Sequence, residues 1–261
     1  MLESNKLQFI NTHSHVYTDA FDNDRNEVIS RAIEHGITKI LLPDIDSEHR
    51  ERVLTLAKEY PENCIPMLGI HPTSVKENYK QEITLLEKAL QENTVKAIGE
   101  IGIDLYWDTT FYKEQVEVLI HQIKLAQSYQ LPIVIHVRNA FTEIFEVLES
   151  LKIEKYNGVF HCFSGNIDDA LKAIDLGFYL GIGGVVTYKK SGLDEVVNAI
   201  SLEHIVLETD DPWLPPVPYR GKRNEPSYLI PIAEKVAEIK QCTLEVVAEI
   251  TSNNAIKLFD L

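Results

Sequence analysis

Apolar runs alternate with segments of helical spacing along the whole chain. Runs such as ITKILLP (37–43) and LPIVIH (131–136) are nearly continuous in apolar residues, which is typical of strands with both faces buried in a parallel sheet. In the segment 24–35 the apolar residues instead fall on one helical face, and Gly36 follows as a stop. The pattern predicts eight strand–helix pairs and one or two closing helices in the tail. The predicted strands are 7–11, 37–43, 64–70, 95–99, 131–136, 158–163, 178–184 and 204–210, and the predicted helices are 24–35, 47–59, 80–91, 111–128, 139–150, 166–175, 192–199 and one beginning near Pro226.

The order of these elements predicts an α/β fold, a single (β/α)8 TIM barrel with C-terminal closing helices. Such a barrel needs about 250 residues, and the chain has 261. By length alone, two ordinary domains would also fit. Because no linker, repeat or low-complexity stretch interrupts the alternation, we expect a single domain, one barrel over residues 1–261. The Pro-rich stretch 215–226 should form a long loop after the last strand.

Side chains that bind metal ions follow several of the predicted strands. In a parallel barrel the carboxyl ends of the strands meet at one mouth, where the chemistry takes place. His13 and His15 are two residues apart, so their side chains lie on the same face of an extended chain. Glu100 follows the fourth predicted strand, and its two oxygens allow it to bridge two cations. The other residues of this kind are His136 at the end of the fifth predicted strand, His161 at the end of the sixth, and Glu208 and Asp210 at the end of the eighth.

Each of these residues also has an ordinary structural explanation when it is taken alone. A glutamate such as Glu100 can cap a helix or pair with an arginine, and a lone His136 or His161 is more often a core residue. Their coincidence at so many strand ends favours one metal-binding pocket. There Asp210 can bind a metal and accept a proton from metal-activated water, while Glu208, one layer deeper, would orient a neighbouring ligand.

Basic residues are expected at the same mouth. Arg138 comes two residues after a candidate ligand, and its planar guanidinium suits a phosphate group. His71 follows the third predicted strand. Arg220, Lys222 and Arg223 form a basic patch in the long loop, although a solvated loop explains this patch equally well.

Aromatic and glycine residues near the mouth are open to more than one interpretation. Tyr106, Trp107 and Trp213 can stack on a nucleic-acid base, but a lid or core role explains them at least as well. The glycines of 181–184 can offer main-chain N–H groups to a phosphate or simply form a tight turn. Asp104 is either a ligand or a turn carboxylate. The remaining histidines, His35, His49, His121 and His204, fall on predicted helices or at the amino end of a strand, so we expect structural or solvent-facing roles for them.

Composition narrows the class of protein. The formal net charge of −15 argues against a broad duplex-binding surface, but not against a nucleic-acid end held by metal ions. Cys64, Cys162 and Cys242 lie far apart without CxxC spacing, as expected for reduced thiols in a cytoplasmic protein. The start, MLESNKLQF, lacks a secretory signal pattern, and no apolar run approaches the roughly 18 residues of a membrane span.

The motifs NTHSH, GIHP, GEIGID, PIVIHVRNA, HCFSG, LETDDPWLPP and RGKRNEP, in this order, resemble those of the TatD family of metal-dependent deoxyribonucleases in the amidohydrolase superfamily. The likeness covers nearly the whole chain. It implies that Glu100 bridges two metals and that Asp210 is the base, and it places His71, Arg138 and Glu208 at positions associated with the substrate phosphate or with support of a ligand. The implied metal ligands are His13, His15, Glu100, His136, His161 and Asp210.

The chain departs from the family pattern at three positions. Asn11 stands where the family usually has Asp, Ser14 replaces a common Cys, and Asp211 replaces a common Ala. None of these changes removes an implied ligand. Asn11 is nevertheless expected to alter the hydrogen bonding and charge around the metals.

The resemblance implies a hydrolase with two divalent metal ions, Mg or Mn by family habit, although the donor set also accepts Zn or Ni. Its predicted reaction is 3′-to-5′ cleavage of phosphodiester bonds at a nucleic-acid end, with single-stranded DNA as the first candidate. Two alternatives remain: hydrolysis of a carboxylic ester or amide, as in relatives linked to D-aminoacyl-tRNA deacylation, and a metal-loaded scaffold without turnover. The sequence leaves the oligomeric state open, a monomer included, and predicts no membrane partner.

Overall fold

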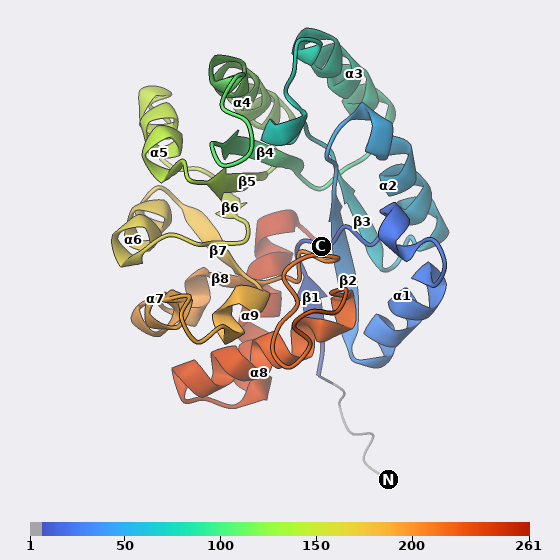
Figure 1. Ribbon diagram of the computed structural model, residues 1–261, viewed down its shortest axis with the longest axis vertical. Helices are drawn as coiled ribbons and strands as arrows, with labels where there is room; N and C mark the ends of the chain where they lie inside the picture. The colour runs from blue at the N-terminus through green and yellow to red at the C-terminus, as the bar shows by residue number, and fades with distance from the viewer. Residues whose placement is uncertain (1–6) are drawn as a thin grey trace.

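The computed structural model describes residues 7–261 and confirms the predicted alternation of parallel strands and helices. The segment MLESNK, part of the stretch in which no secretory signal was expected, lies outside these residues. In Figure 1 the strands occupy the centre and the helices surround them. Residues 7–261 contain eight strands: β1 (Phe9–Asn11), β2 (Ile37–Pro43), β3 (Cys64–Met67), β4 (Ile98–Asp104), β5 (Ile133–Arg138), β6 (Gly158–Phe160), β7 (Phe178–Ile182) and β8 (Ile205–Leu207).

The helices follow the strands in the predicted order, and most bounds agree to within two residues. The helix expected from Pro226 begins as a short 3-10 turn, Pro226–Tyr228, and the α-helix proper starts at Leu229. The tail forms one helix. The described residues contain α1 (Arg25–Glu34), α2 (Ser47–Glu59), α3 (Tyr79–Glu92), α4 (Tyr112–Tyr129), α5 (Phe141–Ser150), α6 (Ile167–Asp175), α7 (Leu193–Ala199), α8 (Leu229–Lys240) and α9 (Leu244–Phe259).

The strands form two parallel runs that are joined at both seams. One run has the order β1-β2-β3 and the other β4-β5-β6-β7-β8. At the first seam Leu68 pairs with Ile98 in an isolated parallel bridge. At the second, the main-chain N–H of Thr12 donates to the carbonyl of Leu207 over 3.0 Å. Hydrogen bonds therefore continue around the ring, as the predicted barrel requires.

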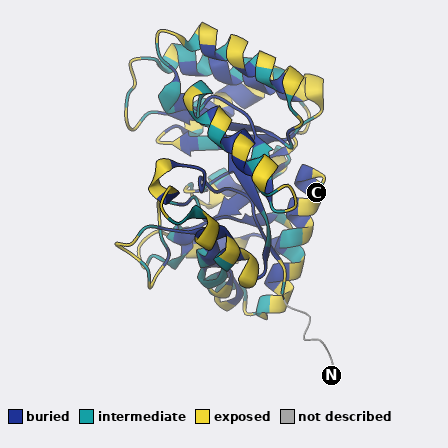
Figure 2. Ribbon diagram, turned by 90° about the vertical axis from the view of Figure 1, so that its right-hand side faces the viewer, coloured by how far each residue is buried: buried dark blue, intermediate teal, exposed yellow. Residues whose placement is uncertain are grey.

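Helix α9 closes the amino-terminal end of the barrel. It contacts β1 and β8, and its last turns supply large apolar side chains to a cluster formed by inward-facing strand residues. Figure 2 shows the strands dark as buried and the outer faces of the helices largely exposed. The amino end is thus sealed, and the polar strand ends lie at the opposite mouth. This cluster comprises Ile10, Leu41, Met67, Ala97, Val134, Val159, Val206, Ala255, Leu258 and Phe259.

Strand β4 differs most from its prediction. Residues 95–99 were expected to form it, but the strand runs from Ile98 to Asp104, so Glu100 lies inside the strand and not after it. The pairing of β4 with β5 shifts between Ile98 and Ile101, which places an irregularity at Glu100. All seven residues of β4 are buried. The carboxylate of Glu100 therefore enters the barrel from within a strand.

None of the helices in the described residues has both the length and the apolar character needed to cross a membrane.

Candidate metal centre

The histidine pair that follows β1 is held by main-chain hydrogen bonds to neighbouring strand ends. The carbonyl of His13 accepts from the N–H of Asp210 over 3.0 Å, and the N–H of His15 donates to the carbonyl of Asp211 over 2.9 Å. Both imidazoles are buried, and their Nε2 atoms lie 3.1 Å apart. The predicted same-face arrangement of this pair is therefore present.

Glu100 lies at the centre of the cluster, with its two oxygens facing different histidines. Oε2 is 3.1 Å from Nε2 of His13 and 3.5 Å from Nε2 of His15. Oε1 is 2.8 Å from Nδ1 of His136 and 2.9 Å from Nε2 of His161. This division of the two oxygens between two sets of nitrogens is the geometry that a bridging carboxylate needs.

Asp210 completes one side of the cluster. Its Oδ1 lies 3.6 Å from Nε2 of His15 and 3.9 Å from Nε2 of His13. Burial raises the pKa of Asp210 to about 8, and the neighbouring charges of Glu100 and Glu208 act in the same direction. A bound cation would oppose this shift, because an adjacent positive charge favours the carboxylate form.

The donor set fits divalent cations. Burial, assisted by the charge of His161, lowers the pKa of His13 well below 6.5, so this imidazole is neutral, as a metal ligand must be. Burial acts to raise the pKa of Glu100, but the charges of His161, His71 and His13 outweigh it and keep the group ionised. Neighbouring carboxylates instead raise the pKa values of His161 and His136 against the effect of burial, and a bound cation would oppose that shift. Imidazoles around an ionised carboxylate are a donor set that Zn, Mn and similar ions accept. Among the described residues three groups of metal-type side chains have ligand atoms within 4.8 Å of one another: His13, Glu100 and His161; His13, His15 and Asp210; and His71, Glu100 and His136.

His71 lies closer to the cluster centre than its predicted substrate role requires. Its Nε2 is 3.2 Å from Oε1 of Glu100 and 3.3 Å from Nδ1 of His136. Its Nδ1 accepts the N–H of Thr73 at 3.1 Å, so the side chain caps the turn Pro72–Ser74 and is held in this orientation. Because Nδ1 accepts this N–H, a neutral His71 carries its proton on Nε2, where it can donate to Oε1 of Glu100 and support that carboxylate but does not offer a lone pair to a metal.

Buried carboxylates support two of the histidines from behind. Oε1 of Glu208 accepts the N–H of Cys162 at 2.5 Å and lies 3.3 Å from Nδ1 of His161. Asp104 contacts His136 in the same way, with 3.0 Å between Oδ2 and Nε2. The supporting role predicted for Glu208 agrees with this geometry. The sequence allowed Asp104 to be either a metal ligand or a turn carboxylate. Its contacts are those of a residue that orients a histidine.

Two further supporting residues were missed in the sequence. The hydroxyl of Tyr17 lies 2.8 Å from Nδ1 of His15, on the side away from the cluster. The carbonyl of Asp44 accepts the N–H of Glu100 over 3.1 Å, and its buried carboxylate accepts from Arg50 over 2.7 Å. Asp44 comes directly after β2, so the strand-end pattern that singled out the other residues would also have found it. Tyr17 carries no comparable signal.

A guanidinium and two aromatic rings stand beside the cluster. Arg138, at the end of β5, lies over the ring of Tyr106 at 3.9 Å and near Trp107 at 5.3 Å. The side chains of Tyr106 and Trp107 are 52% and 68% exposed, so the predicted core alternative does not apply to them. Oδ1 of Asp104 accepts the N–H groups of both aromatic residues, at 2.9 and 3.1 Å. The same carboxylate thus connects this exposed surface to His136.

The two arginines of the basic patch in the long loop have different partners. Arg220 is exposed and lies 4.1 Å over the ring of Tyr188. Arg223 instead donates two hydrogen bonds to the carboxylate of Asp24, at 2.8 and 2.6 Å, and lies over the ring of Phe21. Because its charge is already paired, the geometry favours a structural role for Arg223 over the predicted phosphate contact.

Packing explains two of the glycines in 181–184. A Cβ atom at Gly181 would lie 2.3 Å from Oε2 of Glu208, and one at Gly184 would lie 2.1 Å from the carbonyl oxygen of Leu214. The close approach of these groups accounts for Gly181 and Gly184 without a phosphate, whereas a Cβ at Gly183 would have only ordinary contacts, the nearest at 3.6 Å. The four histidines expected outside the site, His35, His49, His121 and His204, belong to none of the metal-type groups among the described residues.

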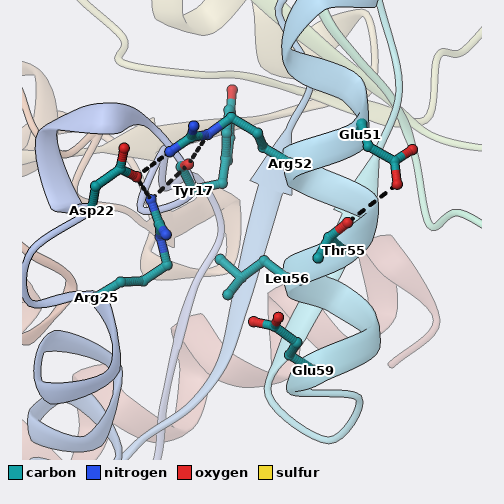
Figure 3. A pocket seen from close by; sticks show the side chains of 8 residues that line it. All are labelled: Tyr17, Asp22, Arg25, Glu51, Arg52, Thr55, Leu56 and Glu59. Atoms are coloured by element: carbon teal, nitrogen blue, oxygen red, sulfur yellow. Dashed lines mark hydrogen bonds and ion pairs between the residues drawn. The ribbon is translucent and has the colours of Figure 1, made fainter.

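A surface pocket of about 380 Å³ lies beside Tyr17, between the start of α1 with the segment before it and helix α2 (Figure 3). Arg25 and Arg52 both pair with Asp22 there. Arg25 also donates to the carbonyl of Val16, and Arg52 to that of Tyr17, each over 2.9 Å. These contacts fix the main chain that follows the histidine pair, which is a structural role.

The comparison with known families agrees with the site. The model for the family described as TatD related DNase matches residues 10–260. This chain belongs to the TatD family. The predicted family is therefore confirmed, and the protein is a metal-dependent hydrolase of that family.

Similar TatD-family proteins cover almost the whole chain. The uncharacterized metal-dependent hydrolase YabD of Bacillus subtilis (strain 168) is 36% identical over 95% of this chain and 97% of YabD. The crystal structure of YjjV, a TatD homolog from Escherichia coli K12, superposes with a TM-score of 0.92 at 31% identity, over 98% of this chain and 99% of YjjV. A TatD family hydrolase from Entamoeba histolytica, 22% identical, shares the fold with a TM-score of 0.83 over 97% of this chain and 98% of that chain. The barrel predicted from the strand pattern is the fold of these structures.

Proposed function

We propose that this TatD-family hydrolase cleaves phosphodiester bonds at a nucleic-acid end, from 3′ to 5′, with single-stranded DNA as its substrate. The observation that carries the proposal is the surface formed by Arg138, Tyr106 and Trp107, which lies beside the metal-type cluster. A guanidinium binds a phosphate oxygen pair, and an exposed aromatic ring stacks on an unpaired base. A substrate with only a carbonyl at its reacting centre needs neither group.

The charge distribution restricts where such a substrate binds. The chain as a whole carries a formal charge of −15, so it repels the body of a polynucleotide. Arg138, at the end of β5, and Arg220, in the loop after β8, are exposed and stack on aromatic rings, and neither forms an ion pair with an acidic residue within residues 7–261. One or two nucleotides at a strand end fit this small basic area better than a duplex does.

The side chains divide the reaction between them. Two divalent cations, when bound, lower the pKa of water and neutralise charge on the leaving oxygen. His13, His15, His136, His161, Glu100 and Asp210 would hold them. Arg138 holds the phosphate, and the carboxylate of Asp210 takes the proton of the attacking water. Glu208 keeps His161 in place through its contact with Nδ1.

Turnover on a matched panel tests the proposal. The panel contains end-labelled single-stranded DNA, the same sequence as RNA, a nitrophenyl phosphodiester, a nitrophenyl carboxylic ester and D-aminoacyl-tRNA, each with Mg, Mn and Zn. We expect shortening of DNA from its 3′ end to be the fastest reaction. Faster hydrolysis of the carboxylic ester or of D-aminoacyl-tRNA would overturn it, and no turnover of any substrate by metal-loaded protein would favour a scaffold.

The variant Arg138→Ala separates the phosphate role from general damage. We expect phosphodiester hydrolysis to fall about 100-fold or more, since a positioned charge contact to a transferring phosphoryl group contributes several kcal/mol. Carboxylic-ester hydrolysis should change far less. Lys172→Ala is the matched control, because Lys172 is also a cation over an aromatic ring, 4.7 Å from Phe145, on the outer helix α6. Equal losses for both substrates in Arg138→Ala would exclude the phosphate contact.

A further inference from the structure

A buried hydrogen-bond network joins the segment after β1 to the segment after β8. It is formed by the side chains of Asn11, Ser14, Thr209 and Asp211, each of which is 0% exposed. Three of these positions are those at which the sequence departs from the family pattern. The network residues flank His13 and Asp210 in the sequence. Their side chains make hydrogen bonds to one another and to neighbouring main-chain groups.

The first half of the network has a fixed direction. Oδ1 of Asn11 accepts the main-chain N–H groups of His13 and Thr209, at 3.3 and 3.1 Å. Because those groups can only donate, the NH2 of Asn11 must be the group that points to Oγ1 of Thr209, over 2.7 Å. The Thr209 hydroxyl, which accepts there, then donates its proton to Oδ1 of Asp211.

The second half converges on the same carboxylate. Oγ of Ser14 lies 3.3 Å from the N–H of Val16, which donates to it. The Ser14 hydroxyl in turn donates to Oδ2 of Asp211 over 3.0 Å. Each oxygen of Asp211 therefore accepts a hydroxyl proton. Both hydroxyl protons of the network are directed at this one side chain, and a carboxylate, unlike an amide, can accept at both of its oxygens.

Only one of the side chains at positions 11 and 211 can accept the hydroxyl proton of Thr209. They lie on opposite sides of the Thr209 hydroxyl, which has one proton to donate. A carboxylate at 211 therefore requires a donor at 11, and Asn11 supplies it. Carboxylates at both positions would place two buried negative charges against one hydroxyl, which is strongly unfavourable.

The network also connects the two segments whose main-chain hydrogen bonds hold three of the candidate metal ligands. The segments it joins are held by the hydrogen bonds from Asp210 N–H to the His13 carbonyl and from His15 N–H to the Asp211 carbonyl. His13, His15 and Asp210 form one of the metal-type groups. A change of direction in the network would shift one segment against the other and alter the separation of these ligands.

We propose that Asn11, Thr209 and Asp211 are positioning residues that hold exactly one buried carboxylate between them, and that this arrangement sets the metal affinity of the His13–His15–Asp210 group. The carboxylate functions at position 211 or at position 11, but not at both. The inference rests on metal binding and not on the choice of nucleic-acid substrate. Its test therefore stays informative if the proposed nuclease activity is absent.

A double-mutant cycle tests the coupling. Co²⁺ affinity is read from the visible absorption of the bound ion, and thermal unfolding is measured on metal-free protein. Asp211→Asn points an amide N–H at one of the two hydroxyl groups that donate to Asp211 in the wild type. Asn11→Asp places carboxylates at both position 11 and position 211. We expect each to weaken Co²⁺ binding by about 10–100-fold, the usual effect of losing a residue that orients a ligand. Each should also lower the unfolding temperature.

The double variant Asn11→Asp/Asp211→Asn reverses every donor and acceptor around Thr209 while keeping one carboxylate. We expect its Co²⁺ affinity to return to within about threefold of wild type, against a loss of about 100-fold or more if the two single effects were independent. Thr209→Val removes the shared hydroxyl and should abolish the rescue. Asn166→Asp/Asp169→Asn is the matched control, because these residues exchange hydrogen bonds at the amino end of α6 with the same charges. It should bind Co²⁺ like wild type.

Independent effects of the two substitutions would refute the shared carboxylate. If the unfolding temperature is rescued but neither single variant changes Co²⁺ affinity, the network only stabilises the seam between the segments, and the positioning role is wrong. A loss of Co²⁺ affinity in the α6 control equal to that of the single variants would likewise refute it, because charge exchange anywhere would then have the same effect.

Discussion

The hydroxyl of Tyr17 determines which nitrogen of His15 is free to bind a metal. It lies 2.7 Å from the carbonyl oxygen of Pro43 and 2.8 Å from Nδ1 of His15. A carbonyl can only accept, so the hydroxyl donates to Pro43 and accepts the proton carried by Nδ1. The lone pair of His15 is therefore on Nε2, which lies 3.5 Å from Glu100 and 3.6 Å from Asp210. Tyr17 thus prepares the imidazole for a metal that it does not contact itself.

Replacing Tyr17 by Phe removes only the hydroxyl group that fixes the tautomer of His15. The side chain is 1% exposed, so water does not readily replace the hydroxyl. The carbonyl of Pro43 and the N–H of His15 lose their partner, at about 1–3 kcal/mol for each unsatisfied group. Taking the lower half of that range for each of the two groups, the free energy of unfolding should fall by about 2–4 kcal/mol. This corresponds to a decrease of roughly 4–16 °C in the unfolding temperature of a protein of this size.

The effect on metal binding distinguishes positioning from stability. With the tautomer no longer fixed, Tyr17→Phe should bind Zn²⁺ or Co²⁺ about 10–100-fold more weakly. Tyr156→Phe is the control, because the hydroxyl of Tyr156 is also buried and donates to a main-chain carbonyl, that of Leu148, over 2.6 Å. It should lose stability and keep its metal affinity. Competition titration with a chromogenic chelator measures both affinities. If the two variants bind metal equally well, the proposed role of Tyr17 is refuted.

Three further outcomes follow from the carboxylates. Asp210→Asn should keep the fold and at least part of its metal binding but lose most hydrolysis, and near wild-type turnover would exclude Asp210 as the base. Burial raises the pKa of Asp210 to about 8, above its value of about 3.9 in an unfolded chain, so its contribution to stability is lost as the pH rises between the two values. Metal-free wild type should therefore lose stability relative to Asp210→Asn from pH 5 to pH 8 in thermal scans; a constant difference would contradict the shift. Glu208→Gln keeps an acceptor for the N–H of Cys162 but removes the charge facing His161, so calorimetry should show metal binding weakened about tenfold, and unchanged affinity would remove its supporting role.

The fold and the identity of the clustered residues were predictable because both depend on local patterns. Each buried parallel strand requires a run of apolar residues, and each strand end delivers its next polar side chain to the same mouth. His136 and His161 were therefore found from their position after such runs. Glu100 was identified for the same reason, although its strand begins later than predicted and contains it. The irregular pairing between Ile98 and Ile101 depends on the neighbouring strand and leaves no mark in the sequence of β4.

The contacts that orient these residues were much less predictable. Arg223 and Arg220 are neighbours in one loop, yet the first pairs with Asp24 while the second stacks on Tyr188. Their difference arises from which distant segment each meets, and loop composition does not encode that. His71 was assigned to the substrate because it follows the third strand and because the resemblance places it at a position associated with the substrate phosphate or with support of a ligand. Its contact with Glu100 joins two different strand ends, which the local sequence does not encode.

The seam between β8 and β1 explains why the site and the closure of the barrel depend on the same residues. Both strands are only three residues long, and no regular ladder joins them. The main-chain bond from Thr12 to Leu207 begins the closure, and beyond it the two segments remain connected by the main-chain bonds described above for His13 and His15 and by side chains such as Asn11. Asp210 lies beyond the end of β8 in a left-handed backbone conformation, with a φ of 55°, and the consecutive residues Thr209 and Asp210 have different contacts. One closes the ring, and the other faces the metal-type cluster.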